Sequence, residues 1–95
     1  MDAKHTPGPW SVGIGSGTLI LADRVPAIAQ VIAPDHEANA RLIAAAPELL
    51  EAAQLVIAWY EAEEDHSKAD FYKRMDMCRE SEAAIRAAIS KATGA

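Results

Sequence analysis

Histidine is the residue type in this sequence most able to mark a metal site. The three histidines, His5, His36 and His66, are about thirty residues apart, and none has a second metal ligand three or four residues further along a predicted helix. Asp35 and Glu37 flank His36, but neighbouring residues of a helix do not point the same way. We therefore expect no bound metal and no cofactor.

The single cysteine, Cys78, is the strongest nucleophile available to the chain. One cysteine excludes an intramolecular disulfide and a cysteine-based zinc site. A reactive thiol needs a nearby base, whereas Cys78 lies on an apolar helical stripe with no histidine close in sequence. We expect it to behave as a small buried hydrophobic residue. Because no nucleophile, base and orienting group come together in the sequence, we do not expect an enzyme.

Gly13, Gly15 and Gly17 have the look of a phosphate-binding loop. A dinucleotide fingerprint requires its third glycine three residues after the second, where this chain has Thr18, and a helix that follows the loop. The chain instead continues with an apolar pattern typical of a strand. The glycines therefore favour a hairpin turn.

Charged residues suggest two further candidate sites. Lys73, Arg79 and Arg86 are six and seven residues apart on a predicted helix, roughly on one side, and are our candidates for binding an anionic ligand. Acidic residues between Glu61 and Asp65 end another predicted helix, where the helix dipole favours cations. They form either a solvated link or an acidic patch for a basic partner.

The overall charge argues against general nucleic-acid binding, which requires a basic surface. The chain has 95 residues, a mass of 10.1 kDa and a net charge of −5, and its length suits a single domain over residues 1–95. Residues 1–33 are neutral, residues 34–66 carry −7 and residues 67–95 carry +2. No membrane span or signal peptide is evident, so we expect a cytoplasmic protein without membrane association.

Residues 1–33 predict an antiparallel β-meander. The Pro-Gly-Pro sequence of residues 7–9 excludes a helix at its start. Apolar stretches separated by turn residues then predict three strands, at residues 10–14, 18–22 and 27–33. Three strands are the minimum for a sheet with a hydrophobic face.

The rest of the chain predicts helices. Asp35 is the expected N-cap of a short helix, and Pro47 suits the first turn of a second. Ser67 begins a capping-box pattern that opens a third helix, which ends near Gly94. A short link favours antiparallel packing of the last two helices. The expected fold class is α+β: a small N-terminal β-meander, a short helix and a C-terminal antiparallel helical hairpin.

Two apolar stripes on the long helices compete for the interface inside the hairpin. We expect the buried stripe to comprise Leu49, Ala53, Val56, Ile57, Phe71, Met75, Cys78, Ile85 and Ile89. The second stripe contains Leu55, Trp59, Ala84 and Ala88. We expect it to be covered by another copy of the chain in a homo-oligomer, and packing within one chain is the alternative.

Two stretches resemble a widespread group of small proteins encoded by tailed phages and prophages. They are HTPGPW at residues 5–10 and EANARLIAAAPELLE at residues 37–51, which together make 21 of the 95 residues. The resemblance implies an accessory phage protein made inside a bacterial cell, and it brings no catalytic residues.

Three classes of function follow as hypotheses. In the first, a non-catalytic binding protein counteracts a host anti-phage defence system, by binding a host defence protein or by sequestering a small anionic signalling nucleotide. In the second, a homo-oligomeric adaptor has a structural or regulatory role and no small-molecule ligand. The third, a small hydrolase, lacks a recognisable catalytic set.

Overall fold

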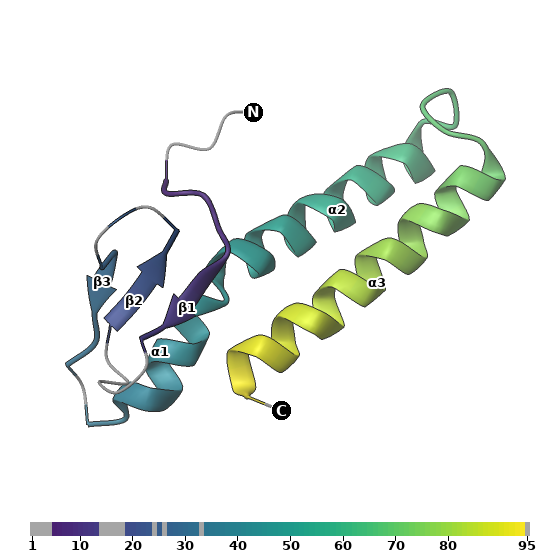
Figure 1. The fold of residues 1–95 in the computed structure, drawn as a ribbon. Helices are drawn as coiled ribbons and strands as arrows, with labels where there is room; N and C mark the ends of the chain where they lie inside the picture. Colours follow the sequence, from purple (N-terminus) through teal and green to yellow (C-terminus); the bar gives the residue numbers. More distant parts are fainter. Residues whose placement is uncertain (1–4, 14–18, 24, 26, 33, 95) are drawn as a thin grey trace.

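The computed structural model describes residues 5–13, 19–23, 25, 27–32 and 34–94. A three-stranded sheet and a short helix form one end of an elongated molecule, and a hairpin of two long helices extends from it (Figure 1). The molecule measures 49 × 28 × 18 Å along its principal axes. This arrangement confirms the expected α+β fold class.

The sheet is an antiparallel meander of β1 (Trp10–Val12), β2 (Leu19–Ala22) and β3 (Ala29–Gln30), in that order. Ile20 at its centre pairs with Val12 on one side and Ala29 on the other. β3 is shorter than the strand expected over residues 27–33, because only two residues of β2 pair with it. The expected glycine turn falls within residues 14–18, outside the described part of the chain.

The core of this end lies between the sheet and α1 (His36–Ala44). Ile20 is fully buried together with Val31 of the sheet end and with Ala40 and Ala44 of α1. Alanines on this side of α1 let the helix lie close to the sheet. Partly buried apolar residues surround the cluster: Trp10, Val12, Ile28 and Ala29.

Helices α1 and α2 (Ala46–Glu64) meet at Ala45 with a bend of 45°. Pro47 lies in the first turn of α2, as expected, where a missing backbone donor has no cost. Asp35 precedes α1, but its side chain makes no capping hydrogen bond. Among the described helices, none is long and apolar enough to cross a membrane alone; α1 and α2 meet that criterion only as a bent pair.

Helix α3 (Phe71–Thr93) begins three residues later than the expected capping box would place it. Asp70 is its N-cap, because the carboxylate accepts a hydrogen bond of 2.8 Å from a backbone N–H of the first turn. Ser67 belongs instead to the turn that joins the two long helices, where it donates to Asp65. Gly94 ends α3 at φ 73°, a conformation that suits glycine.

The expected interface between α2 and α3 is wrong. Small residues, not the large apolar stripe, are buried where the helices meet: Ala52, Ala62, Ser81 and Ala88. Small side chains allow two helices to approach closely. The residues that we expected inside are largely solvent-exposed, among them Ile57, Phe71, Met75, Cys78, Ile85 and Ile89.

Candidate functional site: an apolar face of the helical hairpin

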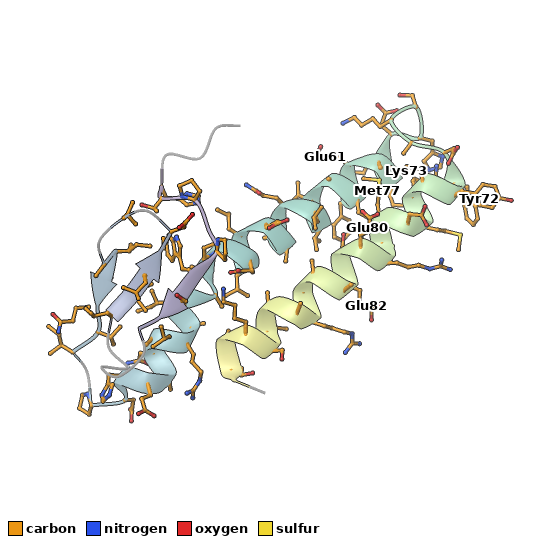
Figure 2. The ribbon with its side chains drawn as sticks, in the orientation of Figure 1. Glu61, Tyr72, Lys73, Met77, Glu80 and Glu82 are labelled. Carbon is orange, nitrogen blue, oxygen red and sulfur yellow. The ribbon has the colours of Figure 1, made fainter. Side chains whose placement is uncertain are left out.

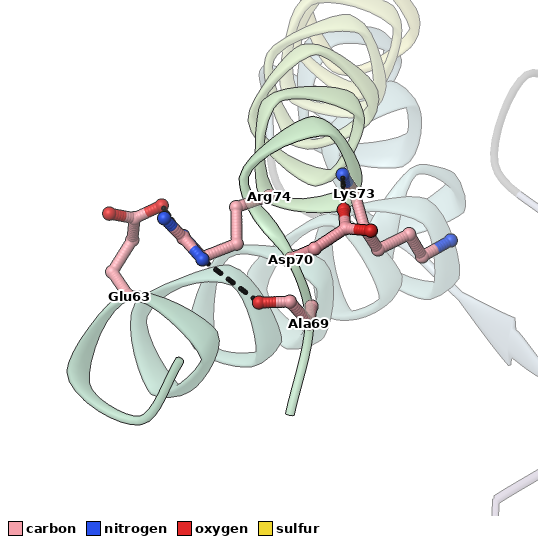
Figure 3. A network of polar contacts seen from close by, with 5 residues as sticks. All are labelled: Glu63, Ala69, Asp70, Lys73 and Arg74. Carbon is pink, nitrogen blue, oxygen red and sulfur yellow. Dashed lines mark hydrogen bonds and ion pairs between the residues drawn. The ribbon is translucent and has the colours of Figure 1, made fainter. Parts of the chain in front are cut away.

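Arg74 holds α3 against α2 at the turn end of the hairpin (Figure 3). Its Nε lies 3.1 Å from Oε1 of Glu63, and its Nη1 donates to the carbonyl of Ala69 at 2.9 Å. The Arg74 side chain is only 11% exposed, and its guanidinium lies 6.0 Å from the centre of the Phe71 ring. Because a planar guanidinium holds its partners in fixed directions, these contacts define how the start of α3 is rotated against α2.

Lys91 holds the other end of the hairpin. Its Nζ lies 2.7 Å from Oε1 of Glu48 and donates to the carbonyl of Trp10 at 2.8 Å, so it joins α3 to α2 and to β1. Our sequence analysis missed these pairs. The expected hairpin could have indicated the Lys91 pair, because an antiparallel turn near residues 65–70 places residue 48 level with residue 91.

With both ends held in this way, one apolar stripe of each helix faces solvent. Together they form a surface that we call the apolar hairpin face, made of Ile57 and Tyr60 on α2 and of Phe71, Met75, Cys78, Ile85 and Ile89 on α3. Four of these residues are between 50% and 59% exposed: Ile57, Tyr60, Phe71 and Ile89. Contiguous exposed apolar side chains are typical of interaction sites.

Ile57 lies at the outer edge of this face, in a hollow that it shares with Ala58 and Glu61. A groove between α2 and α3 places Tyr60 of α2 on the same side of the hairpin as Cys78, Ile85 and Ile89 of α3. It has a volume of about 390 Å³ and is lined mainly by apolar atoms. Val56, Trp59 and Tyr60 contribute from α2, and α3 contributes Cys78, Ser81, Glu82, Ile85, Arg86 and Ile89. The Trp59 and Tyr60 rings lie 5.0 Å apart. This groove can accept an apolar side chain of a partner.

The expected oligomer-interface residues lie inside the hairpin instead. Ala88 is fully buried in the chain, and Leu55, Trp59 and Ala84 are half-buried. This stripe is therefore covered mainly within one chain, which is the alternative that the sequence analysis gave. The large ring of Trp59 lies on the same side of α2 as Ala52 and Ala62, where small residues leave room for it.

The three basic candidates do not share one side of α3. Arg79 and Arg86, seven residues apart, point in nearly the same direction, whereas Lys73 is rotated by more than about 100° from both. Arg86 pairs with Glu82 at 3.0 Å and borders the groove; neither Lys73 nor Arg79 lines it. Of the three candidates for anion binding, only Arg79 and Arg86 therefore lie on one side of α3.

The comparison with protein families matches the whole chain, residues 1–95, to the family described as Salmonella phage P22 protein Y8K6. The chain belongs to this family. Comparisons with curated proteins and with solved structures found no match. The match supports a small phage protein, as the sequence resemblance implied, and assigns no activity to this member of the P22 Y8K6 family.

In this family member the N-terminal Pro-Gly-Pro segment lies on the start of α2. A Cβ added to Gly8 would lie 2.7 Å from Cβ of Pro47, so the two backbones approach as closely as glycine permits. His5, Pro9 and Gln54 contribute to a polar pocket of about 430 Å³ at this junction. The Trp10 indole N–H donates to the carbonyl of Thr6, which holds the segment folded. These contacts give the segment a structural role.

The acidic residues 61–65 are exposed, and part of their charge is paired within the chain. Glu63 pairs with Arg74, and Glu61 lies 3.8 Å from Lys68. The Ser67 hydroxyl donates to Asp65 at 2.6 Å and, with the Ser67 backbone N–H, lowers the pKa of Asp65. These pairs favour the reading of a structured link.

The described histidines and cysteine form no cluster. Among the residues that the structure describes, no three of the types His, Cys, Asp and Glu lie close enough to hold a metal ion. Cys78 is exposed on the apolar hairpin face, so the expectation that it is buried is wrong.

Proposed function

We propose that this member of the P22 Y8K6 family is a non-catalytic phage accessory protein that acts in the host cytoplasm through protein–protein contact. The observation that carries the proposal is the apolar hairpin face, on which side chains as large as Ile57, Tyr60 and Phe71 are more than half exposed. Family membership supports the phage setting. In that setting the contact serves to counteract a host defence system.

The physical case rests on the cost of leaving this face in water. Each large apolar side chain gains about 1.5–3 kcal/mol on full burial, and an aromatic residue beside a groove is a common anchor at interfaces. Tyr60 borders the groove between the helices, and Ile85 and Ile89 lie on its other side. A partner that covers this face recovers the stabilisation that folding of one chain leaves unused.

Two other functions are alternatives, and the geometry argues against only the first. Sequestration of a signalling nucleotide requires several cations around one cavity, whereas the groove holds Arg86 already paired with Glu82. A homo-oligomeric adaptor without a host target uses the same face, and an activity measurement separates it from the proposal. A calorimetric titration with cyclic nucleotides is the control for the sequestration hypothesis.

The test is phage plating on bacterial strains that each carry one defence system. A phage that expresses the wild-type protein is expected to plate better than one without it on at least one such strain, and Tyr60→Glu is expected to abolish the difference. Ala58→Glu introduces the same charge at another exposed position of α2, about 160° around the helix from Tyr60 and outside the groove, so it should retain activity. If Tyr60→Glu protects the phage as well as wild type does, the hairpin face is not the functional surface.

A further inference from the structure

We propose that the apolar hairpin face pairs with the same face of a second copy of the chain. The two hairpins then form a four-helix bundle whose two-fold axis runs parallel to the helices. This inference rests on the proposed function because it uses the same surface. It adds that a second copy of the chain binds to that surface.

The exposed area is sufficient for a dimer. Six large side chains of the face are each between 36% and 59% exposed: Ile57, Tyr60, Phe71, Met75, Ile85 and Ile89. With about 200 Å² for a fully exposed side chain of this size, they offer on the order of 600 Å² per copy. Two copies bury about 1,200 Å² from these residues alone, which reaches the range of stable interfaces.

The rest of the molecule leaves the face accessible. Ile89 and Lys91 are two residues apart on α3, so they point in directions about 200° apart. Lys91 binds the carbonyl of Trp10 on β1 and the carboxylate of Glu48. The Lys91 contacts with β1 and α2 are therefore made on the side of α3 opposite Ile89, and a flat partner can approach the apolar side.

Charge selects the orientation of the second copy. After the Glu48–Lys91 and Glu63–Arg74 pairs within the chain, α2 (Ala46–Glu64) keeps three acidic residues and no basic one, whereas α3 (Phe71–Thr93) keeps three basic and three acidic residues. A two-fold axis parallel to the helices places α2 of one copy over α3 of the other. A two-fold axis perpendicular to the helices places α2 over α2, so that like charges oppose one another. The parallel axis is therefore favoured.

The register of the hairpin predicts a specific pair across this dimer. The Glu48–Lys91 and Glu63–Arg74 contacts place Glu61 level with about residue 77, two residues from Arg79 along α3, and a parallel axis preserves that level between copies. Figure 2 shows Glu61 on the outer side of α2. Arg79 is exposed and has no ion pair within the described part of the chain. Glu61 of one copy thus meets Arg79 of the other along the edge of the bundle.

Sedimentation equilibrium over a range of concentrations tests the pairing. The wild-type protein is expected to have about twice the 10.1 kDa mass of the chain. Tyr60→Glu buries two unpaired carboxylates in the dimer and should weaken association on the order of a hundredfold. Ile89→Glu, at a second exposed position of the face, should do the same, and Ala58→Glu should associate like wild type. Circular dichroism of each variant shows whether the helices remain folded.

Charge reversal tests the orientation. Glu61→Arg and Arg79→Glu should each weaken the dimer several-fold, because each places two like charges side by side, and the double variant should restore wild-type association. Two single variants whose effects simply add would overturn the parallel axis.

The remaining outcomes separate this inference from the proposed function. A wild-type monomer at 100 µM, or a dimer that Tyr60→Glu leaves intact, overturns the second-copy proposal. If such a monomer loses its plating activity with Tyr60→Glu, the face binds a host protein directly and the proposed function stands. If Tyr60→Glu abolishes the dimer and plating activity persists, the pairing stands and the functional surface lies elsewhere.

Discussion

Single residues at the two ends of the hairpin decide how its helices are rotated. Lys91 connects three elements through Glu48 and Trp10, and both side chains of the Lys91–Glu48 pair are about one third exposed. The second carboxylate oxygen of Glu48 is buried without a partner among the described residues. A partly buried carboxylate depends on the one cation that it contacts.

Replacing Lys91 with methionine is expected to lower the free energy of unfolding by about 1–3 kcal/mol, since Glu48 then keeps its position without a cation. Water screens part of the effect at this exposure. Urea denaturation measures it. Lys73→Met removes an exposed ammonium from the same helix and is expected to change the free energy by less than about 0.5 kcal/mol. If both variants lose the same free energy of unfolding, Lys91 does not stabilise the fold through Glu48.

Asp65 is the residue whose titration the fold perturbs. The Ser67 hydroxyl, followed by the Ser67 backbone N–H, favours the charged carboxylate and lowers its pKa. Because the pKa is lower in the folded chain than in the unfolded one, ionised Asp65 stabilises the turn above the unfolded pKa. That contribution is lost as the pH falls through the folded pKa.

Substituting Ser67 is expected to move the pKa of Asp65 back toward the ordinary value for aspartate. NMR titration of the Asp65 carboxyl measures the change. Ser67→Thr retains the hydroxyl and should retain the lowered pKa, whereas Ser67→Ala should raise it. An unchanged pKa in Ser67→Ala would mean that the hydroxyl does not bind Asp65 in solution.

At the scale of elements, the hairpin is built around small residues. Ala52 and Ala62 of α2 and Ser81 and Ala88 of α3 are buried, and the Ser81 hydroxyl donates to the backbone carbonyl of Met77 at 2.7 Å. Close approach of the two helices leaves the longer apolar side chains at the edge of the contact. The same packing therefore produces the buried interface and the exposed face.

Ala88→Leu should be strongly destabilising, because a larger side chain has no space between the helices. The expected loss is about 1–3 kcal/mol in the free energy of unfolding. Ala87→Leu places the same side chain at the neighbouring, exposed position and should be tolerated. Thermal denaturation of both variants measures the difference. If Ala88→Leu is as stable as Ala87→Leu, α2 and α3 meet through a different stripe.

The whole molecule depends on a small core at the end that carries the sheet. Ile20 is the largest side chain that is fully buried among the described residues, and its neighbours Ala40 and Ala44 contribute little apolar area each. A domain of this size has only about 5–10 kcal/mol of stability. One residue therefore accounts for much of the packing between the sheet and α1.

Ile20→Ala is expected to cost about 2–5 kcal/mol, because the neighbouring backbone cannot fully close the cavity. Ile32→Ala makes the same change at a position that is 87% exposed and should have little effect. Guanidinium denaturation, followed by circular dichroism and Trp fluorescence, measures both. Similar stabilities for the two variants would show that the core does not lie between β2 and α1.

Local signals in the sequence determined the order and type of the elements. Proline and glycine act within a few residues, so Pro47 at the start of α2 and Gly94 at the end of α3 were predictable. The strand pattern before Pro34 and the helical period after it predicted the α+β class. Where two residues suited one local role, as Ser67 and Asp70 did for the N-cap of α3, the pattern alone did not choose the correct one.

The tertiary structure alone decided which side of the hairpin is buried, and with it the candidate site. Both apolar stripes have the helical period, so periodicity does not rank them. The ranking comes from contacts between residues far apart in the chain: Glu48 and Lys91 are 43 positions apart, and Glu63 and Arg74 are 11 positions apart. These ion pairs form only when the small residues face inward, because any other rotation of α3 moves Lys91 and Arg74 away from α2.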